Sequence, residues 1–371
     1  MRHKAIVLIA ILFSTLFFSG CYSYRDINKV IFVTSMLIDV DENDNIVVYG
    51  DTLRPYRDAG ESSERGQRGF YKGEGKSLLE ALSDMSLSAS FMLDFSQNKA
   101  IIFSEKAAEK GIDKYMDYLN RSQELNVRSY LFVFYGNLEK LMTMAASNEE
   151  YLGNFLNDVV NKVDASSRTI FMNINDYLTE KRMGSGITVL TALELEEEAG
   201  QEKLHLVGGG VIQEGKLVER LEEKEVLNYN LLTGRVKRGT IEVPNPSDKN
   251  NLITLGIDGG STSTKLEVKD GKTHLVKKIK LRGIIGEAQG ELKLTEELMA
   301  RIAKEAEESL IYSTESFYKE YNRKGLDILN LTRELEKQRL SKDNIKSLEN
   351  VKLLVYPKVS LKGSTNIQNT N

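Results

Sequence analysis

The sequence predicts an α+β fold in which mixed sheets pack against helices in more than one domain. Its 371 residues allow about two or three domains of about 100–200 residues each. Short β-branched runs alternate with amphipathic segments of helical period. One such segment, from about Glu296 to Tyr321, predicts a long helix in the C-terminal domain, with Leu298, Ile302, Ala306 and Leu310 along one face.

The first elements read as a hairpin followed by a helix. Lys29–Asp39 is apolar and β-branched, and Ile46–Leu53 continues it after a polar turn, so both are predicted strands. Residues 54–76 are polar and rich in Gly, which predicts a mobile loop. Ser77 and Glu80 have the spacing of a capping box, which predicts that a helix opens there.

Strands and helices continue to alternate up to residue 186. Ala100–Phe103 and Tyr130–Tyr135 are short apolar runs typical of buried strands. A helix is expected to start at Ser104, and the stretch Asn137–Val163 is expected to form two helices.

From Ile187 onward the pattern changes to strands. Gln213-Glu214-Gly215 is a good hairpin turn, and Val243–Ser247 is the best linker because two prolines lie in a polar stretch. Leu326–Arg339 is expected to be a second late helix. The remaining predicted strands are Ile187–Leu195, Leu204–Ile212, Lys216–Leu221, Val236–Val243, Leu252–Asp258, Thr264–Lys269, His274–Ile284 and Val351–Ser360.

These patterns predict three folded domains between two terminal segments. The expected order is a signal peptide at 1–20, an N-terminal α+β domain at 21–186, a β-rich middle domain at 187–246, a C-terminal α+β domain at 247–363 and a disordered tail at 364–371.

The N-terminus has the pattern of a lipoprotein signal peptide. A basic start precedes an apolar run from Ala5 to Phe18, which suits a signal-peptide core better than a membrane span of about 20 residues. Small residues at Ser19 and Gly20 then precede Cys21, the only cysteine, so that the segment resembles a bacterial lipobox. We therefore predict lipidation of Cys21, of the kind found in Gram-positive lipoproteins; the alternative is an uncleaved anchor with an incidental cysteine.

Composition argues against several classes of function. The formal net charge is −4, and removing residues 1–20 takes away two cations, so nucleic-acid binding is not expected. Three His and one Cys nearly exclude a His/Cys zinc site and exclude an intrachain disulfide. No set of side chains with the spacing of a catalytic site stands out. The sequence therefore favours a protein that is not an enzyme and needs no cofactor.

Two Gly-rich segments resemble phosphate-binding loops. Gly73–Ser77 resembles the end of a Walker A loop, but the spacing to the earlier Gly is wrong and no hydrophobic strand precedes it. Asp258–Lys265 looks like the first phosphate loop of the actin and sugar-kinase ATPases. The competing interpretation is a hairpin turned at Asp258-Gly259-Gly260, because too little chain follows for the second domain of that fold.

The order of segments resembles the Ger(x)C family, the lipoprotein C subunits of spore germinant receptors. The segments that carry this resemblance are Gly20-Cys21, Arg25–Asn28, Gly75–Leu82, Lys99–Ile112, Leu119–Arg121, Arg128–Leu131, Ile284–Glu287, Asp327 and Val359–Gly363. Together they span nearly the whole mature chain.

The resemblance implies a multi-domain α+β ectodomain without catalytic residues. It also implies membrane-embedded A and B receptor subunits as partners, and a lipid anchor on the outer face of the spore inner membrane. Two alternatives stay open. One is a lipid-tethered ATPase that uses Asp258–Lys265, and the other is a substrate-binding lipoprotein of a transporter.

Overall fold

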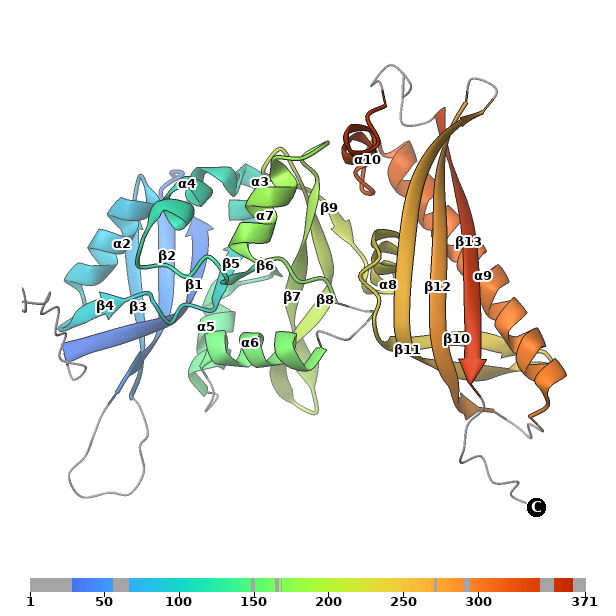
Figure 1. Cartoon of the computed structure of the whole chain (residues 1–371). Helices are drawn as coiled ribbons and strands as arrows, with labels where there is room; N and C mark the ends of the chain where they lie inside the picture. The colour runs from blue at the N-terminus through green and yellow to red at the C-terminus, as the bar shows by residue number, and fades with distance from the viewer. Residues whose placement is uncertain are drawn as a thin grey trace, which may run out of the picture.

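The computed structural model describes residues 29–55, 67–147, 151–163, 167, 169–269, 272–289, 294–340 and 350–362. Two sheets organise this part of the chain, one built from its N-terminal strands and one from its C-terminal strands (Figure 1). Helices pack on both, which confirms the predicted α+β fold class.

The first sheet is mixed, in the order β3-β2-β1-β5-β6-β7-β8-β9, with the short β4 beside β1. Pairing is parallel from β1 through β5 and β6 to β7, and antiparallel toward both edges. The strands are β1 (Val30–Val40), β2 (Ile46–Arg54), β3 (Gln67–Gly75), β4 (Met92–Asp94), β5 (Ala100–Ser104), β6 (Tyr130–Tyr135), β7 (Thr188–Glu198), β8 (Gln201–Gln213) and β9 (Lys216–Leu221).

Helices cover both faces of this sheet, which is why its central strands β5 and β6 consist almost entirely of apolar and aromatic residues. Side chains alternate between the faces of a strand, so Ile101 and Phe103 enter one core and Ala100 and Ile102 the other. Around the sheet lie α2 (Leu78–Leu87), α3 (Glu105–Lys110), α4 (Asp113–Arg121), α5 (Leu138–Ser147), α6 (Leu152–Val163) and α7 (Ile174–Lys181). The cores place α2, α4 and α7 on one face and α5 with α6 on the other.

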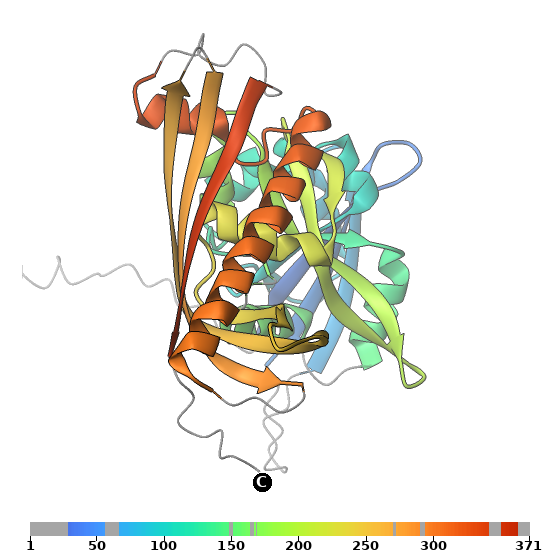
Figure 2. The ribbon, with the colours of Figure 1, turned by 90° about the vertical axis from the view of Figure 1, so that its right-hand side faces the viewer.

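The second sheet has the order β10-β11-β12-β13, antiparallel except for the β12–β13 pair. Its strands are β10 (Gly239–Asn245), β11 (Asp248–Lys269), β12 (Lys272–Ala288) and β13 (Val351–Lys362). Three helices accompany it: α8 (Glu223–Thr233), α9 (Glu296–Arg323) and α10 (Leu331–Lys337). Figure 2 shows α9 lying along the strands of this sheet, where it packs on β13 and β10.

Helix α9 confirms the predicted long helix. Thr295 caps its start, because the threonine side chain accepts a hydrogen bond from the backbone N–H of Leu298. Its 28 residues extend about 42 Å at 1.5 Å per residue. Of the apolar face seen in the sequence, Ile302, Ala306 and Leu310 are buried against the sheet, and Leu298 is partly buried. Further buried residues extend this face toward the end of the helix: Phe317, Tyr318 and Tyr321.

Several expected loops turn out to be strand. Residues 67–75 of the predicted mobile loop form β3, which pairs with β2. The expected linker at Val243–Ser247 is wrong, since Val243, Pro244 and Asn245 lie in β10. Proline is compatible with this position because β10 is an edge strand, and one side of an edge strand needs no hydrogen-bond donor.

The expected middle domain at 187–246 is divided between the two sheets. Strands β7, β8 and β9 extend the first sheet, because β7 pairs in parallel with β6. Strand β10 pairs with β11 and belongs to the second sheet. The change in sequence pattern at Ile187 is therefore a change from crossover helices to antiparallel hairpins within one sheet.

The helix expected from Ser104 is broken in two. Gly111, which ends α3, has φ of 114°, a value that favours glycine and that a continuous helix does not contain. Helices α7 and α8 and strand β4 had no counterpart among the predicted elements. The hairpin turn at Glu214-Gly215 is confirmed, with both residues at positive φ, as a two-residue turn of type I′ requires.

Candidate functional site

The predicted lipidation site lies outside the described residues. Cys21 and the signal peptide precede residue 29, and the predicted tail at 364–371 follows residue 362. Within the described part of the chain, no helix is both long enough and apolar enough to cross a membrane. The lipid anchor therefore stays a prediction from sequence.

The segment Asp258–Lys265 lies inside the long strand β11. The chain does not turn at Asp258-Gly259-Gly260, where a bulge between Ile257 and Gly259 is the one irregularity of this segment in its pairing with β12. The Asp258 carboxylate accepts a hydrogen bond of 2.7 Å from the Arg282 guanidinium. Both the proposed phosphate loop and the proposed hairpin turn are absent at this place, because a phosphate loop needs a turn whose backbone N–H groups converge.

We predict that Mg-ATP does not bind to this strand. Titration calorimetry on the detergent-purified protein is expected to give no saturable heat at micromolar nucleotide, and Asp258→Asn is expected to give the same flat titration. Saturable binding that Asp258→Asn abolishes is the result that would restore the ATPase hypothesis.

The glycines of the Walker-like segment have a packing role. Gly73 and Gly75 lie in β3 directly under α2, and a Cβ atom on Gly73 would collide with the backbone of Ala81 and Met85. The following residue Ser77 is the N-cap of α2, as the capping box predicted. The Gly-rich pattern thus reflects a helix that lies unusually close to a strand.

Histidines and metal ligands offer no catalytic arrangement in the described ranges. His205 in β8 lies 3.3 Å from the Glu198 carboxylate at the protruding end of the β7–β8 hairpin. Among the residues described, no three His, Cys, Asp or Glu side chains are placed to hold a metal ion.

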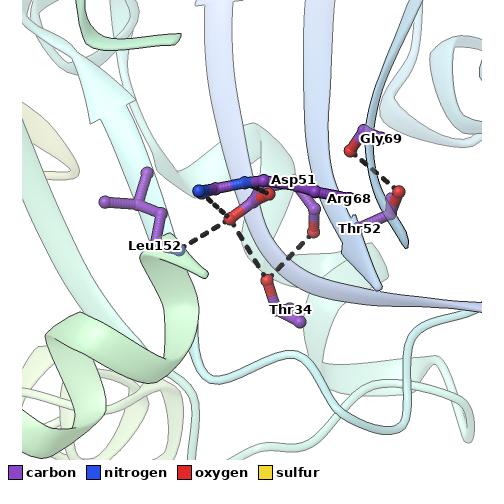
Figure 3. Close-up of polar contacts among 6 residues, drawn as sticks. All are labelled: Thr34, Asp51, Thr52, Arg68, Gly69 and Leu152. Atoms are coloured by element: carbon purple, nitrogen blue, oxygen red, sulfur yellow. Dashed lines mark hydrogen bonds and ion pairs between the residues drawn. The ribbon is translucent and has the colours of Figure 1, made fainter. Parts of the chain in front are cut away.

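A buried carboxylate that the sequence analysis did not single out lies at the centre of a polar cluster in the first sheet. Asp51 in β2 is fully buried, and its two oxygens accept a paired set of hydrogen bonds, both 2.8 Å, from Nε and Nη2 of Arg68 in β3 (Figure 3). Oδ2 also accepts the backbone N–H of Leu152 at 2.6 Å, at the first residue of α6. The Thr34 hydroxyl bonds the Asp51 carbonyl at 3.0 Å.

Local features of three segments bring this cluster together. The β1–β2 register shifts between Val33 and Ser35, which places the bulged Thr34 beside Asp51. Gly153 allows the start of α6 to approach the Thr34 carbonyl, because a Cβ there would collide with it. The Arg68 guanidinium lies 5.4 Å from the Tyr151 ring centre, a cation–π distance.

The Asp51 cluster has the properties of a structural anchor. Both carboxylate oxygens already accept hydrogen bonds, and the negative charge lies at a helix N-terminus, where it is favourable. It ties β2, β3 and α6 together. The signal in the sequence that could have identified this cluster is an acidic residue inside a predicted strand, Ile46–Leu53, that is otherwise uncharged.

Comparisons with known proteins agree over almost the whole chain. A family model described as "Spore germination protein N-terminal domain" matches residues 23–195, and one described as "Spore germination B3/ GerAC like, C-terminal" matches residues 207–365.

Individual relatives have the same description. The chain is 25% identical to "Spore germination protein GerQC" of Bacillus cereus over 263 residues, covering 70% of each chain. It is 24% identical to "Spore germination protein B3" of Bacillus subtilis (strain 168), covering 75% of each. Its fold is similar to the crystal structure of the GerBC protein, with a TM-score of 0.57 and 16% identity over 88% of this chain and 96% of that one.

Proposed function

Because this chain belongs to the spore germination family of GerAC-like proteins, we propose that it is the lipid-anchored C subunit of a nutrient germinant receptor. In this role it has no catalytic activity of its own. It is attached through acylated Cys21 to the outer face of the spore inner membrane, and its folded part contacts the membrane-embedded A and B subunits.

The observation that carries the proposal is the ordered match of both family models. They follow one another along residues 23–195 and 207–365, so the likeness covers the whole architecture rather than one shared domain. The same extent of the chain aligns with the GerBC fold. The alternatives from sequence gain no comparable support, since Asp258–Lys265 is strand and the second sheet is largely antiparallel.

Tethering gives a physical reason for a lipid anchor on such a subunit. Two or three acyl chains hold a protein stably on a bilayer, whereas a single chain binds marginally. Confining this chain and a membrane-embedded partner to one surface raises their effective concentration. Weak contacts between them are then sufficient to keep a receptor complex assembled.

We predict a specific loss of nutrient response when the gene is deleted. Spores without this protein are expected to germinate slowly or not at all with one nutrient germinant, while germination triggers that bypass nutrients act normally. A tagged copy is expected to co-purify with a multi-spanning protein from detergent-solubilised spore membranes. Normal germination of the deletion strain with every nutrient, in the absence of a second copy of the gene, contradicts the proposal.

A further inference from the structure

A polar cavity lies where the first sheet meets the helices of the second. Its volume is about 450 Å³, within the range of small-molecule sites. Glu180 of α7 and Ile187, next to β7, contribute one wall. The opposite wall comes from β11, β12, the segment after α8, and α10. Residues that are far apart in the sequence therefore line the same cavity.

Hydrogen bonds of Asn330, whose backbone conformation is left-handed, connect the two walls of the cavity. Asn330 has φ of 52°, and its side-chain oxygen accepts the backbone N–H of Ser185 at 3.0 Å. Its side-chain N–H group donates to the Met183 carbonyl at 3.3 Å. These bonds fix the start of α10 against the chain between α7 and β7, so the cavity is a built feature of this junction.

Cations outnumber carboxylates around the cavity. Arg235 pairs with Glu180 at 2.7 Å, and Lys337 pairs with Glu334 at 2.9 Å. Two further cations line the cavity, Arg333 and Lys277. Among the residues that the structure describes, neither lies within ion-pair distance of a carboxylate. The lining therefore has more cationic than anionic side chains.

The same cationic side chains include hydrogen-bond donors that have no acceptor. Lys277 is only 4% exposed, and its ammonium group donates to the Thr264 hydroxyl at 2.8 Å. Two buried nitrogen atoms, Nη1 of Arg235 and Nε of Arg333, have no hydrogen-bond partner within the described part of the chain. Buried donors of charged groups are costly to leave unpaired. Two unpaired donors of this kind, beside the buried ammonium group of Lys277, indicate that a bound group completes their hydrogen bonds.

We propose that this cavity binds a small oxyanion, a carboxylate or a phosphate, between Arg235, Lys277 and Arg333. A guanidinium matches either group with two parallel hydrogen bonds, and the lysine ammonium adds a point charge. The cavity exceeds the size of one such group, so an organic acid fits it better than an inorganic ion. The inference is independent of the receptor role, since it rests on the described side chains alone.

The position of the site implies that a bound ligand stabilises the folded protein. A bound oxyanion contacts side chains from β12, from the segment after α8 and from α10, close to the wall that Glu180 and Ile187 provide. Binding therefore stabilises the junction of the two sheets. A ligand that binds only the folded chain raises its thermal midpoint, and above the dissociation constant the rise grows with the logarithm of the ligand concentration.

The protonation of Lys277 makes binding depend on pH. Burial lowers the pKa of Lys277 to about 8, Glu334 and Asp327 oppose that decrease, and Lys337 adds to it. The other charged groups that face the cavity are Glu180 of α7, Arg235 after α8, and Arg333 of α10. Because the oxyanion favours the charged lysine, the contribution of Lys277 to the affinity is expected to be fully present below about pH 8 and to be lost as the pH rises above it.

Titration calorimetry on the detergent-purified full chain tests this site. The probes are succinate, citrate and inorganic phosphate, each up to about 10 mM, a concentration at which even a weak specific site binds its ligand. At least one of the three is expected to bind and to raise the thermal midpoint. Comparison of succinate with phosphate distinguishes the carboxylate from the phosphate class. Lys277→Met and Arg333→Gln are each expected to weaken binding about tenfold or more, because each removes charge-assisted hydrogen bonds.

A matched control lies on the same strand. Lys278 is exposed and points to the opposite face of β12, so Lys278→Met is expected to leave the affinity within about twofold. Lys277→Met removes a buried charge and keeps the volume, so the variant is expected to fold, which the thermal midpoint checks. Absence of binding by all three probes overturns the proposal, and so does equal binding by wild type, Lys277→Met and Arg333→Gln.

Discussion

Replacing Asp51 with alanine is expected to lower the free energy of unfolding by about 3–5 kcal/mol, the cost of removing one partner from a buried ion pair. The change leaves the Arg68 guanidinium without its carboxylate in a site where its side chain is only 14% exposed. It also removes the acceptor for the Leu152 N–H at the start of α6. Urea unfolding followed by circular dichroism measures the loss.

Two comparison variants separate the buried pair from ordinary surface charge. Glu74 in the neighbouring β3 is half exposed and pairs with Lys72, so Glu74→Ala is expected to cost less than about 1 kcal/mol. Replacing Asp51 and Arg68 together by leucine is expected to cost less than Asp51→Ala alone, because no unpaired charge remains buried. An Asp51→Ala variant as stable as Glu74→Ala would show that this cluster does not anchor α6.

The second large effect concerns the anchor. Cys21→Ala is expected to remove the acyl chains and release a folded protein from the membrane, because those chains supply the membrane affinity. Metabolic labelling with a fatty-acid analogue is expected to mark the wild type and leave Cys21→Ala unlabelled. Ser23→Ala, two residues away, is the control and is expected to keep the label.

The same experiment distinguishes the two hypotheses for the N-terminus, a lipidated Cys21 and an uncleaved membrane anchor. Label that persists on Cys21→Ala excludes this cysteine as the attachment site. An unlabelled wild type that stays in the membrane fraction supports the alternative of an uncleaved anchor. In the receptor role, loss of the anchor is expected to reduce nutrient germination as strongly as deletion does, because the effective concentration at the membrane is lost.

Local pattern was sufficient wherever one short segment carried the information. The apolar runs at Ala100–Phe103 and Tyr130–Tyr135 predicted strands buried on both faces, and β5 and β6 lie between two helix layers. The capping box at Ser77 predicted the start of α2. The apolar face from Glu296 predicted α9. Each of these depends on residues within about two helical turns or one strand.

Long-range pairing explains where the predictions were wrong. Nothing near Ile187 indicates that β7 pairs with β6, since that pairing brings together residues that α5, α6 and α7 separate in sequence. Pro244 indicated a linker, but it lies in β10 at the edge of the second sheet, and Pro357 lies in β13 at the other edge. A proline is tolerated in a strand according to its place in the sheet, which is a property of the tertiary fold.

The sequence by itself determined the α+β class, the order of most elements and the family, because composition, periodicity and short motifs carry that information; the anchor at Cys21 stays a prediction. Only the tertiary structure decided which polar groups are buried together. Lys277 stands in a Lys-rich run beside Lys278 and Lys280, yet it faces inward with Leu275 and Ile279. Lys277 lines one cavity with Arg235 and Arg333, and Asp51 accepts a hydrogen bond from Leu152. Both arrangements depend on elements that contact each other only after the chain has folded.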